Sequence, residues 1–272
     1  MEIIIRPKTK WWRLDLRELW MYRDLSYFLS WKDLKVRYKQ TSIGALWAVF
    51  QPLFSMIVFT VFFGRLAKIP SDNIPYPIFV YCGLLFWLLF SNSLSSSAES
   101  FVGNERLITK VYFPRLLLPL STITTNFLDF LIASGILVIM MFYYRYAPSL
   151  LGILMVPFLL LLTVAATLGI GLFIGSLNVK YRDVRFALPF FIQLLIFITP
   201  VIYPASIVSP KHQWILGLNP MAGVIDTARA VLLSSTPIHW GLLGVSVLCT
   251  MIYCFLGYFY FQKVEKYFAD II

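Results

Sequence analysis

Residues 150–185 read LLGILMVPFLLLLTVAATLGIGLFIGSLNVKYRDVR, and this stretch decides the class of fold. From Leu150 to Leu177 no side chain is charged, and a helix of that length can cross the roughly 30 Å hydrocarbon core of a bilayer. The run contains small residues of the kind that let membrane helices approach one another closely, namely Gly169, Gly171 and Gly175. The stretch therefore predicts a membrane-spanning helix that ends at the charged residues after it.

The rest of the chain has the same character. Of its 272 residues, 59% are hydrophobic and 13% are charged, whereas a soluble domain carries about 25% charged residues. This composition excludes a soluble globule. Apolar runs predict six spans in all, at about 43–64, 76–98, 114–145, 149–177, 185–203 and 238–261. The length leaves no room for a second soluble domain of ordinary size, so we expect any nucleotide-hydrolysing domain on another chain.

Two further segments lie outside the predicted spans. In residues 1–42, Trp12, Leu16, Leu19 and Trp20 recur at helical spacing with charges between them, which is typical of a helix in the membrane interface; a plain cytoplasmic anchor is the alternative. The other segment, at 205–236, contains several prolines and polar residues, which predicts short re-entrant outer helices before the last span. The expected fold is an all-α membrane protein with an interfacial segment at 1–42, a six-span domain at 43–272 and outer short helices at 205–236.

The distribution of basic residues predicts the orientation of the chain. The sequence has 23 Lys and Arg and a net charge of +10. Of these, 18 fall in the N-terminal segment, the loops after the second and fourth spans, and the C-terminal tail. Because basic residues concentrate on the cytoplasmic side of membrane proteins, both termini are expected in the cytoplasm.

The sequence offers no recognisable catalytic, metal or nucleotide site. The three cysteines form no CxxC pair, the two histidines pair with no obvious carboxylate or nucleophile, and no GxxxxGK[ST] motif occurs. Asp129 is the only acid well inside an apolar span. A lone carboxylate is a poor proton relay, so it is as well explained by a helix cap or a bond to a serine. We expect a non-enzymatic subunit with no cofactor or metal of its own.

Two sets of residues are candidates for contact with a substrate. A basic run just before the first span, Lys32, Lys35, Arg37 and Lys39, is suited to anionic headgroups or to a pyrophosphate-linked substrate. The chain is also rich in rings, with 24 Phe, 15 Tyr and 8 Trp, and rings stack on the apolar faces of sugars. Candidate channel aromatics at same-face spacing are Trp47, Phe50, Phe54, Phe86, Trp87 and Phe90, although lipid contact or helix packing explains any one ring as well.

Four stretches, in the expected order along the chain, resemble the membrane subunit of ABC-2-type exporters that move polysaccharides such as O-antigen, capsule or teichoic acid. They are WKDLKVRYKQTSIGALWAVFQPL at 31–53, VYFPRLLLPLS at 111–121, NVKYRDVRFALPFFIQLLIFITPVIYP at 178–204 and LNPMAGVIDTARAVLL at 218–233. The resemblance implies a homodimer that binds two copies of a separate ABC ATPase, which carries the ATP and Mg. It further implies a lipid-linked polysaccharide as the substrate, membrane lipids as neighbours and no nucleic acid.

The resemblance also implies which residues meet the ATPase and which form an outer gate. The residues expected to couple ATP hydrolysis to transport are Trp31, Asp33, Arg37, Tyr38, Glu99, Glu105, Arg106, Lys110, Arg182 and Asp183. The broken fifth span and the following short helix are expected to form the gate, with Pro200, Tyr203, Pro204, Asn219, Pro220, Asp226 and Arg229. Asp226 and Arg229, three residues apart on a helix, are expected to pair with each other or across the dimer axis.

Two other functions fit part of the sequence. One is an ABC-2-type exporter of drugs or lipids, which would share every motif but move no glycan. The other is a membrane transferase that acts on lipid-linked sugars, which would need a compact set of acids or histidines at one face of the membrane.

Overall fold

A computed structural model describes residues 16–39, 44–209, 211–233 and 237–268. Throughout these residues the regular structure is helical, which confirms the predicted class. The elements are α1 (Leu16–Met21), α2 (Arg23–Lys39), η1 (Gly44–Leu46), α3 (Trp47–Phe59), η2 (Thr60–Leu66, π-helical), α4 (Tyr76–Gly103), α5 (Glu105–Lys110), α6 (Leu117–Tyr144), α7 (Leu150–Lys180), α8 (Val184–Ile198), η3 (Ala205–Ile207), α9 (Gln213–Leu216), α10 (Pro220–Leu232) and α11 (Trp240–Glu265).

Five of the described segments are long and apolar enough to cross a membrane, and they match the first, second, third, fourth and sixth predicted spans. The fifth predicted span is shorter than expected, because α8 has 15 residues and ends at Ile198. Thr199 is extended, with ψ 139°, as the ring of Pro200 requires of the residue before it. The chain then continues to Pro204 without helix, so the predicted boundary at 203 is corrected to 198.

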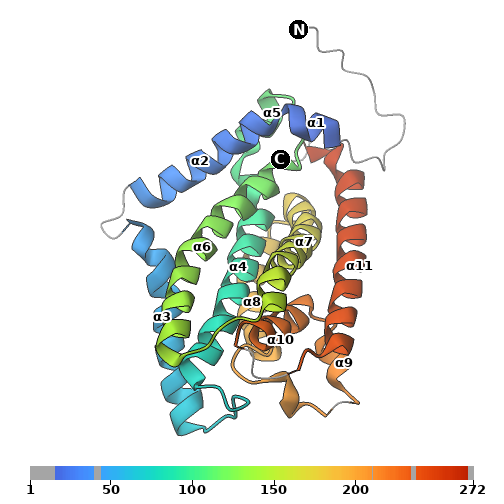
Figure 1. The fold of residues 1–272 in the computed structure, drawn as a ribbon. Coiled ribbons are helices and arrows are strands. Elements are labelled where there is room, and N and C mark those ends of the chain that lie inside the picture. Colours follow the sequence, from blue (N-terminus) through green and yellow to red (C-terminus); the bar gives the residue numbers. More distant parts are fainter. Residues whose placement is uncertain (1–15, 40–43, 210, 234–236, 269–272) are drawn as a thin grey trace.

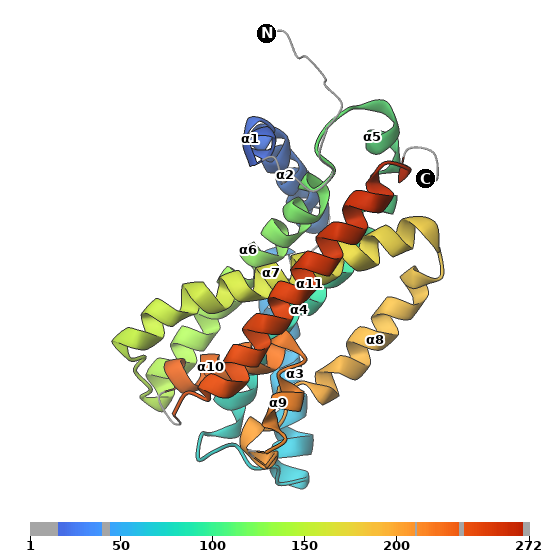
Figure 2. The ribbon, with the colours of Figure 1, turned by 90° about the vertical axis from the view of Figure 1, so that its right-hand side faces the viewer.

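The helix α4 is the central helix of the bundle. Its side chains are buried on nearly every side from Ile78 to Phe90, and α3, α6, α7, α8 and α10 all pack against it. By contrast, α3 and α8 expose most of their apolar side chains and stand at the edge of the bundle (Figures 1 and 2). A helix with so much exposed apolar surface is stable only against lipid or another protein surface.

The bundle has two different ends (Figures 1 and 2). At one end, called here the α2 end, lie α1, α2, α5, the turn between α7 and α8, and the last turn of α11. At the other, the α10 end, lie η2, α9, α10 and the turn between α6 and α7. The helix α2 crosses the α2 end over α6, and α10 packs between α4, α7 and α11.

The small residues of α7 do not form the one face predicted, because they lie on different sides of the helix and meet two helices. A methyl group added at Gly169 would lie 2.6 Å from the backbone nitrogen of Cys254 on α11, and one added at Gly171 would lie 2.6 Å from Ser97 Oγ on α4. On α11, Gly257 is equally restricted, because its added methyl would collide with the carbonyl oxygen of Gly169. These glycines allow α7 to approach its two neighbours more closely than any other residue would permit.

Candidate functional site

The helix α2 has one face against the bundle and one face away from it. Leu29 and Ser30 are buried against α6, whereas the opposite face exposes large apolar side chains together with basic ones. The exposed apolar side chains of α2 are Tyr27, Phe28, Trp31 and Val36. This arrangement is typical of a helix that lies in a membrane interface.

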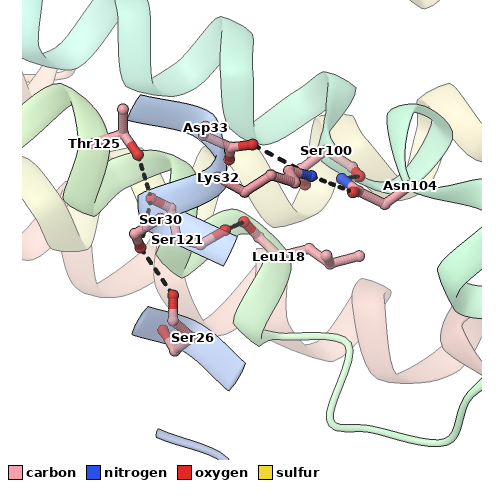
Figure 3. A network of polar contacts seen from close by, with 9 residues as sticks. All are labelled: Ser26, Ser30, Lys32, Asp33, Ser100, Asn104, Leu118, Ser121 and Thr125. Carbon is pink, nitrogen blue, oxygen red and sulfur yellow. Dashed lines mark hydrogen bonds and ion pairs between the residues drawn. The ribbon is translucent and has the colours of Figure 1, made fainter. Parts of the chain in front are cut away.

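Polar contacts fasten α2 to α6 and to the junction of α4 with α5 (Figure 3). Ser30 Oγ lies 3.3 Å from the carbonyl oxygen of Ser121 on α6. Lys32 Nζ donates to Asn104 Oδ1 at 3.2 Å and lies 3.4 Å from Asp33 Oδ1. Asn104 precedes α5 directly and donates to the carbonyl oxygen of Ser100 at 2.8 Å. The Asn104 side chain therefore links the start of α5 to both α4 and α2.

At its other end α2 contacts the lone intramembrane acid. Arg37 Nη1 lies 2.5 Å from Asp129 Oδ2 and 3.0 Å from Asn126 Oδ1, and the Tyr38 hydroxyl donates to Asp129 Oδ1. Burial raises the pKa of Tyr38 to about 12, and its hydrogen bond to Asp129 acts in the same direction. Tyr38 therefore stays protonated and remains a donor at neutral pH.

The expectation that Asp129 caps a helix or bonds a serine is wrong. Its partners come from a segment some ninety residues earlier in the chain, which no local pattern could reveal. The available signal was physical, since a charge inside an apolar helix needs a partner and Arg37 lies just before the first span.

Around this ion pair α2, α3, α4 and α6 line an open cavity of about 460 Å³. Its walls are polar for a cavity among apolar helices, with amide, hydroxyl and charged side chains from all four helices. The lining residues are Arg37, Tyr38, Trp47, Ala48, Gln51, Asn92, Ser95, Ser96, Asn126 and Asp129. We call it the polar cavity.

A second cavity, of about 370 Å³, lies at the α2 end between the start of α5 and the turn from α7 to α8. It brings together Glu105 and Arg182, both predicted to couple to the ATPase, and adds Arg185, which was not predicted. Asn178 also lines it and fixes the turn, because its buried amide donates to the carbonyl oxygen of Ala98 at 3.0 Å.

The predicted coupling residues fall into two groups. Glu99, Glu105, Arg106, Lys110, Arg182 and Asp183 are exposed on α4, α5 and the turn between α7 and α8. Trp31, Asp33, Arg37 and Tyr38 lie on α2, where Asp33 faces the α5 junction and the last two residues face the polar cavity. In the basic run, Lys32 and Arg37 are engaged in intrachain contacts, while Lys35 and Lys39 are exposed.

The six candidate channel rings do not form one surface. Trp47, Phe50 and Phe54 lie along the exposed side of α3, with successive ring centroids 6.4 Å and 6.0 Å apart. Phe86, Trp87 and Phe90 are instead buried in the core on α4, where Phe86 packs edge-on against Phe130. Only the α3 rings present a surface that a substrate or a partner chain can contact in this conformation.

At the α10 end, Arg229 holds the broken fifth span in place. Its guanidinium is buried and donates to the carbonyl oxygens of Phe79 at 3.0 Å, Pro200 at 2.7 Å and Val201 at 2.6 Å. It also lies 3.6 Å from the centroid of the Phe79 ring. The guanidinium is always charged at neutral pH, and it is neutralised here by carbonyl dipoles and a ring face.

The predicted pairing of Asp226 with Arg229 is wrong. Asp226 Oδ2 lies 2.8 Å from His239 Nδ1, before α11. Spacing of three residues placed both on one helix, but α10 is buried on nearly all sides, so the two side chains reach different neighbours.

Other predicted gate residues join the broken fifth span to α10. Asn219 caps α10, because its Oδ1 accepts from the backbone nitrogen of Met221 at 3.1 Å, and its Nδ2 donates to Thr199 Oγ1 at 2.6 Å. Pro220 occupies the first turn of α10, as helix starts favour. The Tyr203 hydroxyl donates to the carbonyl oxygen of Ile198 at 2.6 Å, and Pro204 is buried before η3. The broken span and α10 thus form one connected unit.

These features define a multi-pass helical membrane protein with an interfacial helix, and the described residues contain no cluster of three potential metal ligands. Its sequence matches the profile of the ABC-2 type transporter family over residues 25–233. The chain therefore belongs to the ABC-2 type transporter family.

Curated relatives extend over nearly the whole chain. An O-antigen export system permease protein, RfbA, from Klebsiella pneumoniae is 30% identical over 92% of this chain and 95% of its own. Its namesake from Myxococcus xanthus is 31% identical over 79% of this chain and 83% of its own. The polysialic acid transport protein KpsM of Escherichia coli is 23% identical over 86% of this chain and 91% of its own.

Proposed function

We propose that this chain is the membrane permease subunit of an ATP-driven exporter of a lipid-linked polysaccharide, O-antigen-like in class. The observation that carries the proposal is the similarity to O-antigen export permeases along almost the full length of both chains. Supporting it, the chain has a surface suited to each further component: an interfacial helix, an exposed aromatic face on α3, and a charged cavity beside α5.

In this proposal the α2 end faces the cytoplasm of a bacterium and the chain lies in the inner membrane. The basic residues concentrated at that end support this orientation. The ATPase subunit docks on the charged cavity that Glu105, Arg182 and Arg185 line. ATP and Mg bind to that subunit, which acts in two copies on a homodimer of the permease.

The contacts of α5 indicate how force would reach the membrane. The ATPase would move α5, and Asn104 would transmit that displacement to Lys32 and α2. The other end of α2 contacts Asp129 inside the bundle. Closure of the ATPase subunits would therefore alter the relation of α2 to α6, beside the exposed rings of α3.

Surface display of glycan tests the proposed function directly. Deletion of the gene, with the cognate ATPase gene intact, should abolish surface glycan and leave lipid-linked glycan in the cytoplasmic leaflet, and a plasmid copy should restore export. Unchanged surface glycan in the deletion strain would refute the proposal.

Charge reversal tests the docking surface. The variant that combines Glu99→Lys, Glu105→Lys and Arg106→Glu should uncouple ATP hydrolysis from export without loss of membrane-inserted protein, because all three side chains are exposed. The matched control is the reversal of Lys211, an exposed residue at the α10 end. Normal export by the triple variant would contradict the coupling role.

A further inference from the structure

The polar cavity combines the Arg37–Asp129 pair, and Asn126 that contacts Arg37, with further polar side chains. Its walls include the amides of Gln51, Asn92 and Asn126 and the hydroxyls of Ser95 and Ser96. A volume of about 460 Å³ lies within the range of small-ligand sites, which is roughly 300–1,000 Å³. Amides and hydroxyls both donate and accept hydrogen bonds, so this lining matches a ligand whose groups also do both.

The charges of the cavity cancel. Among the described residues that line the cavity, Arg37 and Asp129 are the only ionised side chains, and they contact each other at 2.5 Å. Tyr38 stays neutral, because burial raises its pKa to about 12. A phosphate ligand is favoured by uncompensated Arg or Lys charges, and a cation by uncompensated carboxylates. The cavity has neither, so its chemistry selects a neutral ligand rich in hydroxyl groups.

An aromatic side chain at the edge of the polar cavity also favours a sugar as the ligand. Trp47 lines the cavity and remains about half exposed, and Phe50 lies beside it with the ring centroids 6.4 Å apart. A flat ring next to amide and carboxylate groups can cover the apolar face of a pyranose while the polar groups bind its hydroxyls.

We propose that the polar cavity binds neutral sugar residues of the exported glycan as the glycan enters the permease. The proposal rests on the proposed function and assigns one site within it. It also revises the predicted role of the basic run, since Arg37 is neutralised by Asp129. Lys35 and Lys39, exposed on α2, are the members of that run open to a phosphate group.

The test uses variants that remove hydrogen-bonding groups and keep the Arg37–Asp129 pair. The double variant Gln51→Leu with Asn92→Leu removes two lining amides, and Trp47→Leu removes the ring. The matched controls are Gln193→Leu on α8 and Trp240→Leu at the start of α11, both exposed and outside the cavity. Asn92→Ser keeps a polar group at one of the two positions.

Two probes separate sugar recognition from phosphate recognition. The permease with its ATPase, in lipid nanodiscs, is incubated with radiolabelled glycan released from its lipid by mild acid, and separately with polyprenyl phosphate. The double variant and Trp47→Leu should each retain at least tenfold less glycan than the wild type. Asn92→Ser should retain an intermediate amount, and polyprenyl phosphate retention and basal ATPase activity should not change.

Several outcomes would overturn the site. They are no glycan retention by the wild type, unchanged retention by the variants, an equal loss in the controls, or a loss of polyprenyl phosphate instead of glycan. Export assays separate this failure from failure of the proposed function. If the deletion strain loses surface glycan while the cavity variants export normally, only the cavity assignment fails.

Discussion

Arg229→Met is expected to release the broken fifth span from α4. The substitution keeps an unbranched side chain of similar length but removes all three donors to the carbonyl oxygens of Phe79, Pro200 and Val201. The hydrogen bonds to the carbonyl oxygens of Pro200 and Val201 contribute about 1.5–3 kcal/mol each, whereas the carbonyl oxygen of Phe79 also accepts a bond within α4 and loses less. Against this, the variant no longer buries a charge, which offsets several kcal/mol.

The bonds to Pro200 and Val201 together contribute about 3–6 kcal/mol, and removal of the buried charge offsets part of this, so the net loss should be about 3 kcal/mol. For a chain of this size that corresponds to a fall in Tm of roughly 6–12 °C, measured on purified protein in nanodiscs. Gly83→Ala offers an independent approach to the same contact, because the added methyl would collide with Nη2 of Arg229 while the arginine itself is retained. Arg65→Met, at an exposed arginine of η2, is the matched control and should leave Tm within about 1 °C.

The readout at the site itself is the accessibility of residue 206. Ser206 is exposed in η3, just beyond the broken span, and a cysteine placed there reports movement of that segment by its labelling rate. Faster labelling is expected with Arg229→Met and not with Arg65→Met. If Arg229→Met matched the wild type in both Tm and labelling, the three carbonyls would not depend on the guanidinium, and the reasoning would be refuted.

Three further predictions concern other contacts. Gly257→Ala should lower Tm strongly, because the methyl would collide with the carbonyl oxygen of Gly169; a Tm within 2 °C of the wild type would show that α7 and α11 separate at little cost. Tyr38→Phe should destabilise by about 1 kcal/mol at every pH from 6 to 9. Since the folded pKa of Tyr38 is raised from 10.0 to about 12, the stability it adds is fully present below pH 10 and lost as the pH rises to 12, so unfolding at pH 9 and 11 checks the sign. Asn104→Leu, which removes the acceptor of Lys32, should lower export per ATP hydrolysed, whereas Thr109→Val, on exposed α5, should not.

The class of fold follows from the sequence because each predicted feature depends on neighbouring residues. The length of an uncharged run such as Leu150–Leu177 can be read directly from the sequence, and that length decides whether an apolar helix can span a membrane. The close approach of α7 to its neighbours follows in the same way from its glycines, although Gly169 and Gly171 meet different helices and do not form one face. The error at the end of α8 is also a local one. Pro200 determines the conformation of Thr199, and the span had been placed by the length of the apolar run alone, which ignores this constraint.

The contacts of the site depend on residues far apart in the chain, and here the sequence was less informative. It identified α2, α5 and the turn after α7 as separate segments, and the structure joins two of them around one charged cavity. It could not pair Asp129 with Arg37, or separate Asp226 from Arg229, because both results require the position of α2 over α6 and of α10 inside the bundle. Charge and spacing restrict the possible partners, and packing selects among them.

Arg37 and Arg229 show how differently the chain can neutralise a charge, and the difference bears on movement. Arg37 is compensated by a carboxylate on another helix and lies beside a cavity, with part of its side chain exposed, so water can replace its partner when α2 shifts. Arg229 is fully enclosed and compensated by three carbonyls whose positions the backbone sets, so its release would leave a charge and the carbonyls of Pro200 and Val201 unsatisfied at once. The energetic cost of displacing α2 is therefore much smaller than that of opening the broken span. In a transport cycle we expect the α2 end to respond first and the α10 end to open only when a larger force is applied.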